Sequence, residues 1–173
     1  AARLILEKNL SGMEIDPRAA AMASFALTMK ARELDSRFLR RGVKPRITVL
    51  SRVEFEPEEL QYIPNLSARP QLLDAVAHLD ECGSLLTVTK DDMDALAGDL
   101  ASPAGENTIF GGSAVEKLEL MRAELEPLGR SYDVVVANPP YMGSSNMNAW
   151  VSKWVKKNYP ISKSDLCTCF FSR

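Results

Sequence analysis

The sequence predicts an α/β protein with a mostly parallel sheet flanked by helices. Short apolar runs alternate with helix-forming segments, the connections between them are short, and helix-capping residues stand at several boundaries. Strands that alternate with helices in this way form parallel sheets with right-handed crossovers. The 173 residues, of which 46% are hydrophobic and 25% charged, are enough for one domain with a sizeable core.

The first part of the chain is predicted to form a strand, a turn and a helix. Residues 1–10 are expected to end a helix that leads into a strand at residues 12–16. Asp16 is predicted to cap the next helix and Pro17 to begin it, because proline needs no hydrogen-bond donor at that position. This helix is expected to run as far as Gly42, and the next strand to span Ile47–Leu50.

The second part of the chain is predicted to contain two helices and a further strand. One helix is expected over residues 69–83, followed by an irregular surface excursion over residues 91–112. Ser113 and Glu116 form a capping-box pattern that predicts the start of a helix ending at residue 129. The β-branched run Val134–Ala137 follows almost at once and is typical of a buried parallel strand.

That last strand ends in an unusual way, on the residues of "ANPPYMGSS". Ligands of open parallel sheets bind outside the carboxyl ends of the strands. Asn138 offers an amide oxygen and Pro139 a carbonyl oxygen as acceptors, while Pro140 adds stiffness to the loop and Tyr141 offers a flat ring for stacking. Two acceptors and a stacking ring suit an exocyclic amino group on a planar base or amide.

Such an amino nitrogen is a poor nucleophile because its lone pair is delocalised. Two fixed acceptors favour a more tetrahedral nitrogen and place it in line with an electrophilic carbon, without a covalent intermediate or a metal. A base that begins in duplex DNA must be rotated out of the stack to reach this pocket. Glu14 lies near the carboxyl end of the predicted strand at residues 12–16, where an acid commonly binds the ribose hydroxyls of a nucleoside cofactor.

Charge is unevenly distributed along the chain. Residues 142–173 carry five basic residues and one acid, whereas residues 1–141 carry 16 basic residues and 22 acids. The basic segment is expected either to meet phosphates or to form a solvated helix face. Three cysteines with unsuitable spacing predict buried thiols and no metal site. The chain has no long apolar run and no signal-peptide layout, which predicts a cytoplasmic location without a membrane partner.

N-P-P-Y after a hydrophobic strand resembles the catalytic motif of amino-group methyltransferases that use S-adenosylmethionine. The segments "NLSGMEIDPRAAAMASFALTMKAR", "ANPPYMGSSNMN" and "KKNYPISKSDLCTCFFSR" together resemble the adenine-specific methyltransferases (PglX type) of the BREX phage-defence systems. The resemblance is thin over residues 55–107. It implies a partial Rossmann-like, S-adenosylmethionine-dependent methyltransferase fold.

The resemblance also implies roles for the residues of the motif. Asn138, Pro139 and Pro140 would hold the amino group of adenine, and Tyr141 would stack on the flipped base. The implied partner is therefore double-stranded DNA, and other phage-defence proteins are further candidate partners.

For the cofactor, the resemblance implies that Glu14 binds the ribose and that Ile15 packs on the adenine of S-adenosylmethionine. Asp165, within the segment "SKSDL", would help to form the pocket for the cofactor and the target base. The family has a further residue that contacts the cofactor adenine, and Ser51 and Ser84 are the candidates for it here.

Residues 1–173 are expected to be part of one catalytic domain that lacks the first strand with its Gly-rich cofactor loop, the last strands and the target-recognition domain. The implied reaction is methyl transfer to the N6 amino group of adenine in DNA, within a phage-defence or restriction-modification system. The piece by itself is expected to be inactive, and to be unstable or self-associating through exposed apolar edges.

Two other interpretations of the motif remain open. The same residues can present a glutamine amide of a protein or the amino group of guanine in RNA. The chain can also be a non-catalytic binding module derived from a methyltransferase.

Overall fold

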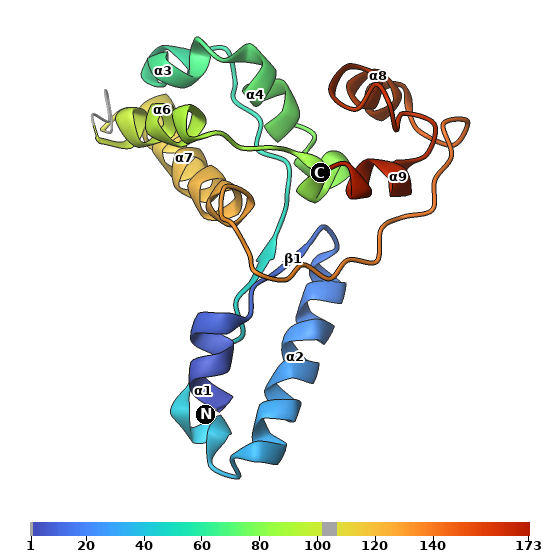
Figure 1. Cartoon of the computed structure of the whole chain (residues 1–173). Coiled ribbons are helices and arrows are strands. Elements are labelled where there is room, and N and C mark those ends of the chain that lie inside the picture. Colours follow the sequence, from blue (N-terminus) through green and yellow to red (C-terminus); the bar gives the residue numbers. More distant parts are fainter. Residues whose placement is uncertain (1, 102–106) are drawn as a thin grey trace.

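The structure is a computed structural model and describes residues 2–101 and 107–173. Figure 1 shows an N-terminal arm, drawn in blue at the bottom, and a larger group of helices above it. The arm contains α1 (Ala2–Leu4), a π-helical turn (Ile5–Asn9), β1 (Gly12–Glu14), α2 (Pro17–Leu34), a 3-10 turn (Phe38–Arg41) and β2 (Ile47–Val49).

The upper group consists of short helices around a shared apolar core. α8 and α9 lie on one side of it in Figure 1, and α3, α6 and α7 on the other. In chain order its elements are a 3-10 turn (Leu60–Tyr62), α3 (Pro64–Ser67), α4 (Pro70–Val76), α5 (Leu79–Cys82), a 3-10 turn (Gly83–Leu85), α6 (Lys90–Ala101), α7 (Ile109–Leu128), α8 (Ala149–Asn158) and α9 (Leu166–Phe171).

The sheet of the described residues consists of two parallel strands. Gly12 of β1 lies opposite Ile47 of β2, and the Leu50 N–H donates to the Glu14 carbonyl at 2.8 Å just beyond the ladder. Both strands were predicted, so this part of the prediction is confirmed. The chain is a mixed helical structure with a small parallel sheet, consistent with part of a Rossmann-like domain.

The prediction of a buried strand at Val134–Ala137 is wrong for this chain. These residues form no ladder, and Val136 is 93% exposed. The reason is that none of the described strands lies beside them to accept and donate backbone hydrogen bonds. The predicted "mostly parallel sheet" is therefore reduced to β1 and β2 in the part of the chain that the structure describes.

The start of α2 is as predicted, but its end is not. The Asp16 carboxylate accepts the Arg18 N–H at 2.8 Å, and Pro17 is the first helical residue. The predicted continuous helix to Gly42 stops at Leu34. There the Asp35 carboxylate accepts the N–H of Arg37 and competes with the helical backbone bonds.

The predicted helix over residues 69–83 is divided into α4 and α5. The division occurs at His78, whose ring Nδ1 bonds to the Asp74 carbonyl at 3.0 Å, while its N–H donates to the Ala75 carbonyl instead. The imidazole thus bonds to the Asp74 carbonyl, which would accept the His78 N–H in an uninterrupted helix.

The prediction of an irregular excursion at residues 91–112 is also wrong for its described part. Residues 90–101 form α6, because Leu96 is fully buried in the core and supplies the packing that stabilises a short helix. Residues 102–106 lie outside the described residues. α7 begins before the predicted capping box, with Thr108 as its cap, and the Ser113 hydroxyl donates to the buried Glu59 carboxylate.

One buried acid connects the sheet with the helices. Glu124 of α7 is 3% exposed, and its carboxylate accepts the Ser51 hydroxyl at 2.5 Å and the Ser51 N–H at 3.2 Å. Burial raises the pKa of Glu124, and the two bonds from Ser51 oppose the shift only in part. Ser51 follows β2, so this contact fixes the end of that strand against α7.

The raised pKa of Glu124 predicts a pH dependence of stability. The folded state holds this proton more tightly than the unfolded state, so the contribution is complete below the ordinary pKa of 4.5 and is lost as the pH rises through the folded-state value. Glu124→Gln keeps a hydrogen-bonding side chain without the charge. Urea denaturation between about pH 4 and pH 8 should give a flatter stability profile for Glu124→Gln than for wild type. Equal slopes, or a flattening also in the exposed control Glu126→Gln, would contradict this assignment.

Candidate active site

The carboxylate of Glu14 is held at the end of β1 by its own backbone. Oε1 accepts the N–H of Ile15 at 2.8 Å and that of Asp16 at 3.1 Å. The structure gives Oε2 no hydrogen bond among the described residues. Glu14 therefore presents one oriented and unoccupied acceptor at the carboxyl end of a parallel strand, as recognition of a ribose requires.

Gly83 brings a second segment to the same end of β1. It has φ 51° and ψ −136°, a backbone conformation that favours glycine, and a Cβ built on it would stand 3.4 Å from Cγ2 of Ile15. Ser84 is the next residue in the chain. Ser51, the other candidate for contacting the cofactor adenine, already has its hydroxyl and N–H engaged by Glu124. The geometry therefore favours Ser84 over Ser51.

The N-P-P-Y segment is extended and accessible. Asn138, Pro140 and Tyr141 are exposed, Tyr141 to 83%, and Pro139 is half-buried. Among the described residues, the Asn138 amide and the Tyr141 ring have no hydrogen bond or ring contact with another side chain. Both groups are thus available to a ligand, and no hydrogen bond among the described residues joins them to Glu14 or Ile15.

The residues after Tyr141 are tied to the segment that contains Asp165. Gly143 and Asp165 form an antiparallel bridge, the Leu166 N–H donates to the Met142 carbonyl at 2.9 Å, and the Ser144 N–H donates to the Ser164 carbonyl at 2.9 Å. The Asp165 carboxylate caps α9 by accepting the Cys167 N–H at 2.8 Å. The structure therefore places "SKSDL" beside the end of the N-P-P-Y loop.

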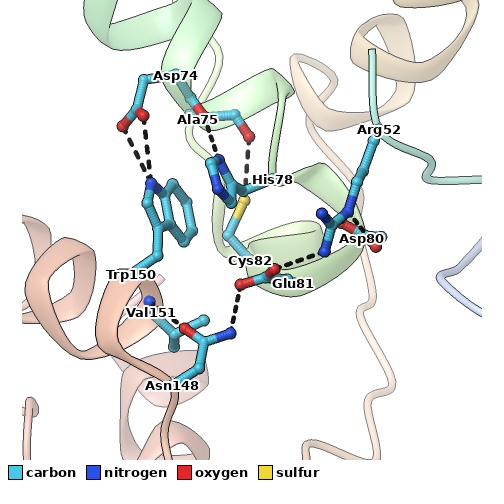
Figure 2. A network of polar contacts seen from close by, with 10 residues as sticks. All are labelled: Arg52, Asp74, Ala75, His78, Asp80, Glu81, Cys82, Asn148, Trp150 and Val151. Atoms are coloured by element: carbon cyan, nitrogen blue, oxygen red, sulfur yellow. Dashed lines mark hydrogen bonds and ion pairs between the residues drawn. The ribbon is translucent and has the colours of Figure 1, made fainter. Parts of the chain in front are cut away.

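A polar network fixes the start of α8, the first helix after this loop (Figure 2). Asn148 caps α8 through Oδ1, which accepts the Val151 N–H at 2.8 Å, and its Nδ2 donates to Oε2 of Glu81 at 2.6 Å. Oε1 of Glu81 accepts from Arg52 at 2.6 Å. Arg52 also pairs with Asp80 at 2.7 Å, so the loop after β2, α5 and α8 meet in one set of contacts.

Trp150 forms a second contact between α8 and α4. Its indole N–H lies 3.3 Å from each oxygen of Asp74, and its ring stacks on His78 with centroids 4.1 Å apart. Trp154 extends the stack at 5.9 Å. His78 thus packs against Trp150 of α8. The sequence offered one signal for this network, since Asn148 directly precedes the helix-forming run "AWVSKWVKK".

The basic segment lies partly along a cleft. A cavity of about 730 Å³ is lined by residues of α8, α4 and the chain end, including Lys153, Lys157 and Trp154. Both lysines are exposed and belong to none of the ion pairs of the described residues. Arg173, also in the lining, instead donates to the carbonyls of Ser84 and Leu128 at 2.9 and 3.2 Å.

The thiols are not arranged for catalysis. Cys82 and Cys169 are buried as predicted, while Cys167 is partly exposed. Burial raises the pKa of Cys82 to about 12, so this thiol stays protonated. Among residues 2–101 and 107–173 no group of acids, histidine and cysteines could hold a metal ion. Over the same residues, no helix is long and apolar enough to cross a membrane.

Known proteins match this chain over almost all of its length. Residues 8–173 match the family described as Eco57I restriction-modification methylase. The chain is 33% identical over 198 residues to the adenine-specific methyltransferase BrxX of Escherichia coli O9:H4 (strain HS), an alignment that covers 97% of this chain and 16% of that protein. It is 32% identical over 185 residues to the adenine-specific methyltransferase PglX of Lacticaseibacillus casei (strain Zhang), covering 100% of this chain and 15% of that protein. The chain therefore spans about a sixth of the length of these curated relatives.

The conformation of Gly83 predicts an asymmetry between two glycines. Gly83→Ala combines a strained backbone with a close approach to Ile15, whereas Gly42, with φ 64°, has no atom within 4 Å of an added Cβ. Gly83→Ala should lower the free energy of unfolding by about 1–3 kcal/mol, and Gly42→Ala by less. Urea denaturation of both variants measures the difference, and equal losses would contradict the contact between Gly83 and Ile15.

Proposed function

This chain belongs to the Eco57I restriction-modification methylase family, and we propose that the protein containing it methylates the N6 amino group of adenine in DNA. Membership of a methylase family implies the use of S-adenosylmethionine in general. The names of the two relatives, both adenine-specific methyltransferases, support adenine over a glutamine amide or guanine. The catalytic motif is therefore assigned to a DNA base.

One observation carries this proposal: the unoccupied amide and ring of the N-P-P-Y loop. In the proposed reaction the Asn138 amide oxygen and the Pro139 carbonyl oxygen each accept a hydrogen bond from one N–H of the adenine amino group. Pro140 stiffens the loop, and Tyr141, with its exposed ring, stacks on the base after it leaves the duplex. No further group has to be displaced, since the structure gives neither Asn138 nor Tyr141 a competing side-chain partner among the described residues.

The bond changes follow from this arrangement. S-adenosylmethionine supplies a methyl group on a positively charged sulfur, which makes the methyl carbon electrophilic. When it is bound, N6 of adenine would form the new N–C bond with this carbon as the C–S bond breaks, the electron pair of that bond would stay on sulfur, and N6 would release one proton to solvent. The two acceptors contribute by favouring the tetrahedral nitrogen of the transition state and by fixing its direction of attack.

The residues at the end of β1 fit a nucleoside cofactor. The free oxygen of Glu14 suits the ribose hydroxyls, and the exposed part of Ile15, beside Gly83, suits an adenine ring. Ser84 is the candidate for the polar contact with that ring. Asp165 would act from the segment bridged to Gly143, at the junction of the cofactor side and the target base.

The remaining assignments concern the whole protein. We assign residues 1–173 to one catalytic domain, and expect cofactor loop, further strands and DNA target recognition to come from other parts of the longer protein. The chain by itself is expected to be inactive. The proposed substrate is double-stranded DNA, and the proposed setting is phage defence. Other defence proteins are the candidate partners, and the proposed location is the cytoplasm.

Substitutions in the loop test the proposed roles. In the full-length protein, Asn138→Ala should reduce the rate of methyl transfer on the order of 100-fold, as for loss of one catalytic hydrogen bond. Tyr141→Ala should weaken productive DNA binding about tenfold or more through the lost stacking, and Tyr141→Phe should retain it. Transfer of a labelled methyl group to duplex DNA measures both. Asn146→Ala, in the same loop, is the matched control, and undiminished activity of Asn138→Ala would overturn the assignment.

The cleft lysines test whether the basic segment contacts DNA. If Lys153 and Lys157 each neutralise one phosphate, the double variant Lys153→Gln/Lys157→Gln should reduce the slope of log K against log salt by about 1.8. Lys8→Gln/Lys44→Gln removes two exposed charges from the N-terminal arm and should leave the slope unchanged. Binding of the full-length variants to duplex DNA over a range of salt concentrations gives the slopes. Equal slopes for the two double variants would support the solvated-face interpretation instead.

A further inference from the structure

We propose that Glu81 and Asn148 are a positioning pair that sets the N-P-P-Y loop relative to the cofactor side of the site. This inference rests on the proposed function. It concerns residues that touch neither the base nor the cofactor, and it follows from how the two ends of the loop are held.

The loop depends on its ends because its middle is free. The side chains of Asn138 and Tyr141 make no hydrogen bond or ring contact among the described residues. Before them, the Tyr132 hydroxyl donates to the Pro127 carbonyl at 2.9 Å and holds the loop to the end of α7. After them, the bridge between Gly143 and Asp165 and the start of α8 hold the other end. The location of the acceptors is therefore set by these anchors.

Asn148 uses both ends of its side-chain amide at this anchor. Its oxygen caps α8, and its nitrogen donates to Glu81 at 2.6 Å. Glu81 lies on α5, two residues before Gly83, where a built Cβ would stand 3.4 Å from Cγ2 of Ile15. The four-residue helix α5 thus carries Glu81, which bonds to the loop anchor at Asn148. Directly after the helix comes Gly83, which lies near Ile15 on the proposed cofactor side.

Arg52 connects the same carboxylate to the sheet. It donates to Glu81 at 2.6 Å and follows Leu50, whose N–H bonds to the Glu14 carbonyl at 2.8 Å. Hydrogen bonds and the short chain segment from Leu50 to Arg52 therefore connect Glu14 with Asn148 by way of Glu81. Figure 2 shows the part of this connection from Arg52 through Glu81 to Asn148. The side chain of Glu81 is 17% exposed, whereas Asn148 is exposed, so water reaches the pair from the Asn148 side.

The packing of Trp150 keeps α8 folded and docked when the position of the loop anchor changes. Trp150 stacks on His78 and donates to Asp74 independently of Asn148, so α8 remains docked when the contact to Glu81 is broken. Loss of the pair should therefore shift the anchor of the loop without unfolding the helix.

A double-variant cycle in the full-length protein tests the pair. Asn148→Asp keeps an acceptor for the Val151 N–H, and its charge suits a helix N-terminus, but it sets a carboxylate against Glu81. We expect kcat to fall about tenfold, an effect of the size typical of coupled neighbouring residues. The KM values for DNA and S-adenosylmethionine should stay within about twofold of the wild-type values. In Asn148→Asp/Glu81→Gln the glutamine amide donates to the new carboxylate, and kcat should return to within about threefold of wild type.

Hydrogen exchange supplies a second readout that does not need activity. Backbone amides of residues 142–148 should exchange faster in Asn148→Asp and return to the wild-type rate in Asn148→Asp/Glu81→Gln. The control Glu126→Gln, which breaks the exposed ion pair with Arg130, should change neither kcat nor exchange.

The outcomes separate this inference from the proposed function. Unchanged kcat and exchange in Asn148→Asp, or a loss that the double variant does not restore, would overturn the positioning role even if wild type methylates adenine. A wild-type protein without adenine methylation would overturn the proposed function, while the exchange data would still decide whether the pair anchors the loop.

Discussion

The arrangement of the candidate site depends on a short helix with two different neighbours. α5 is followed by Gly83, which lies near Ile15, and α5 holds Asn148 through Glu81. The positive φ of Gly83 favours glycine at that position, and the bond to Asn148 requires an acceptor at position 81. One short helix thereby joins the proposed cofactor side to the anchor of the N-P-P-Y loop.

The apolar surface is divided between a packed part and an open part. The helices between Leu50 and Leu128 share a continuous core, with side chains such as Ile63 and Leu79 fully buried. The two-stranded sheet has little such support, and a pair of short strands is marginal without further layers. Exposed apolar side chains gather on α2 and at residues 134–136, as expected for surfaces that are covered in a larger structure. This chain spans about a sixth of the length of the curated relatives.

Local chemistry made some elements predictable from the sequence. Asp16 and Pro17 define the start of α2 through contacts within one turn, and the β-branched run at Ile47–Val49 forms the expected parallel strand. α6 was missed because its stability comes from burial of Leu96, which only the tertiary structure provides. Ser113 was misassigned as a cap because its actual partner, Glu59, is 54 residues away. The same limit hid the pair of Glu81 and Asn148, which are separated by 67 residues. The proposed acceptors of the N-P-P-Y loop are adjacent in sequence, so their chemistry alone was enough to propose them.

If the N-P-P-Y loop presents the amino group of adenine for methylation, the product identifies the reaction most directly. Duplex DNA is incubated with the full-length protein and isotopically labelled S-adenosylmethionine, and its nucleosides are analysed by mass spectrometry. We expect the label to appear in N6-methyldeoxyadenosine. Label in a methylated cytosine or in protein glutamine, or no labelled product at all, would contradict it.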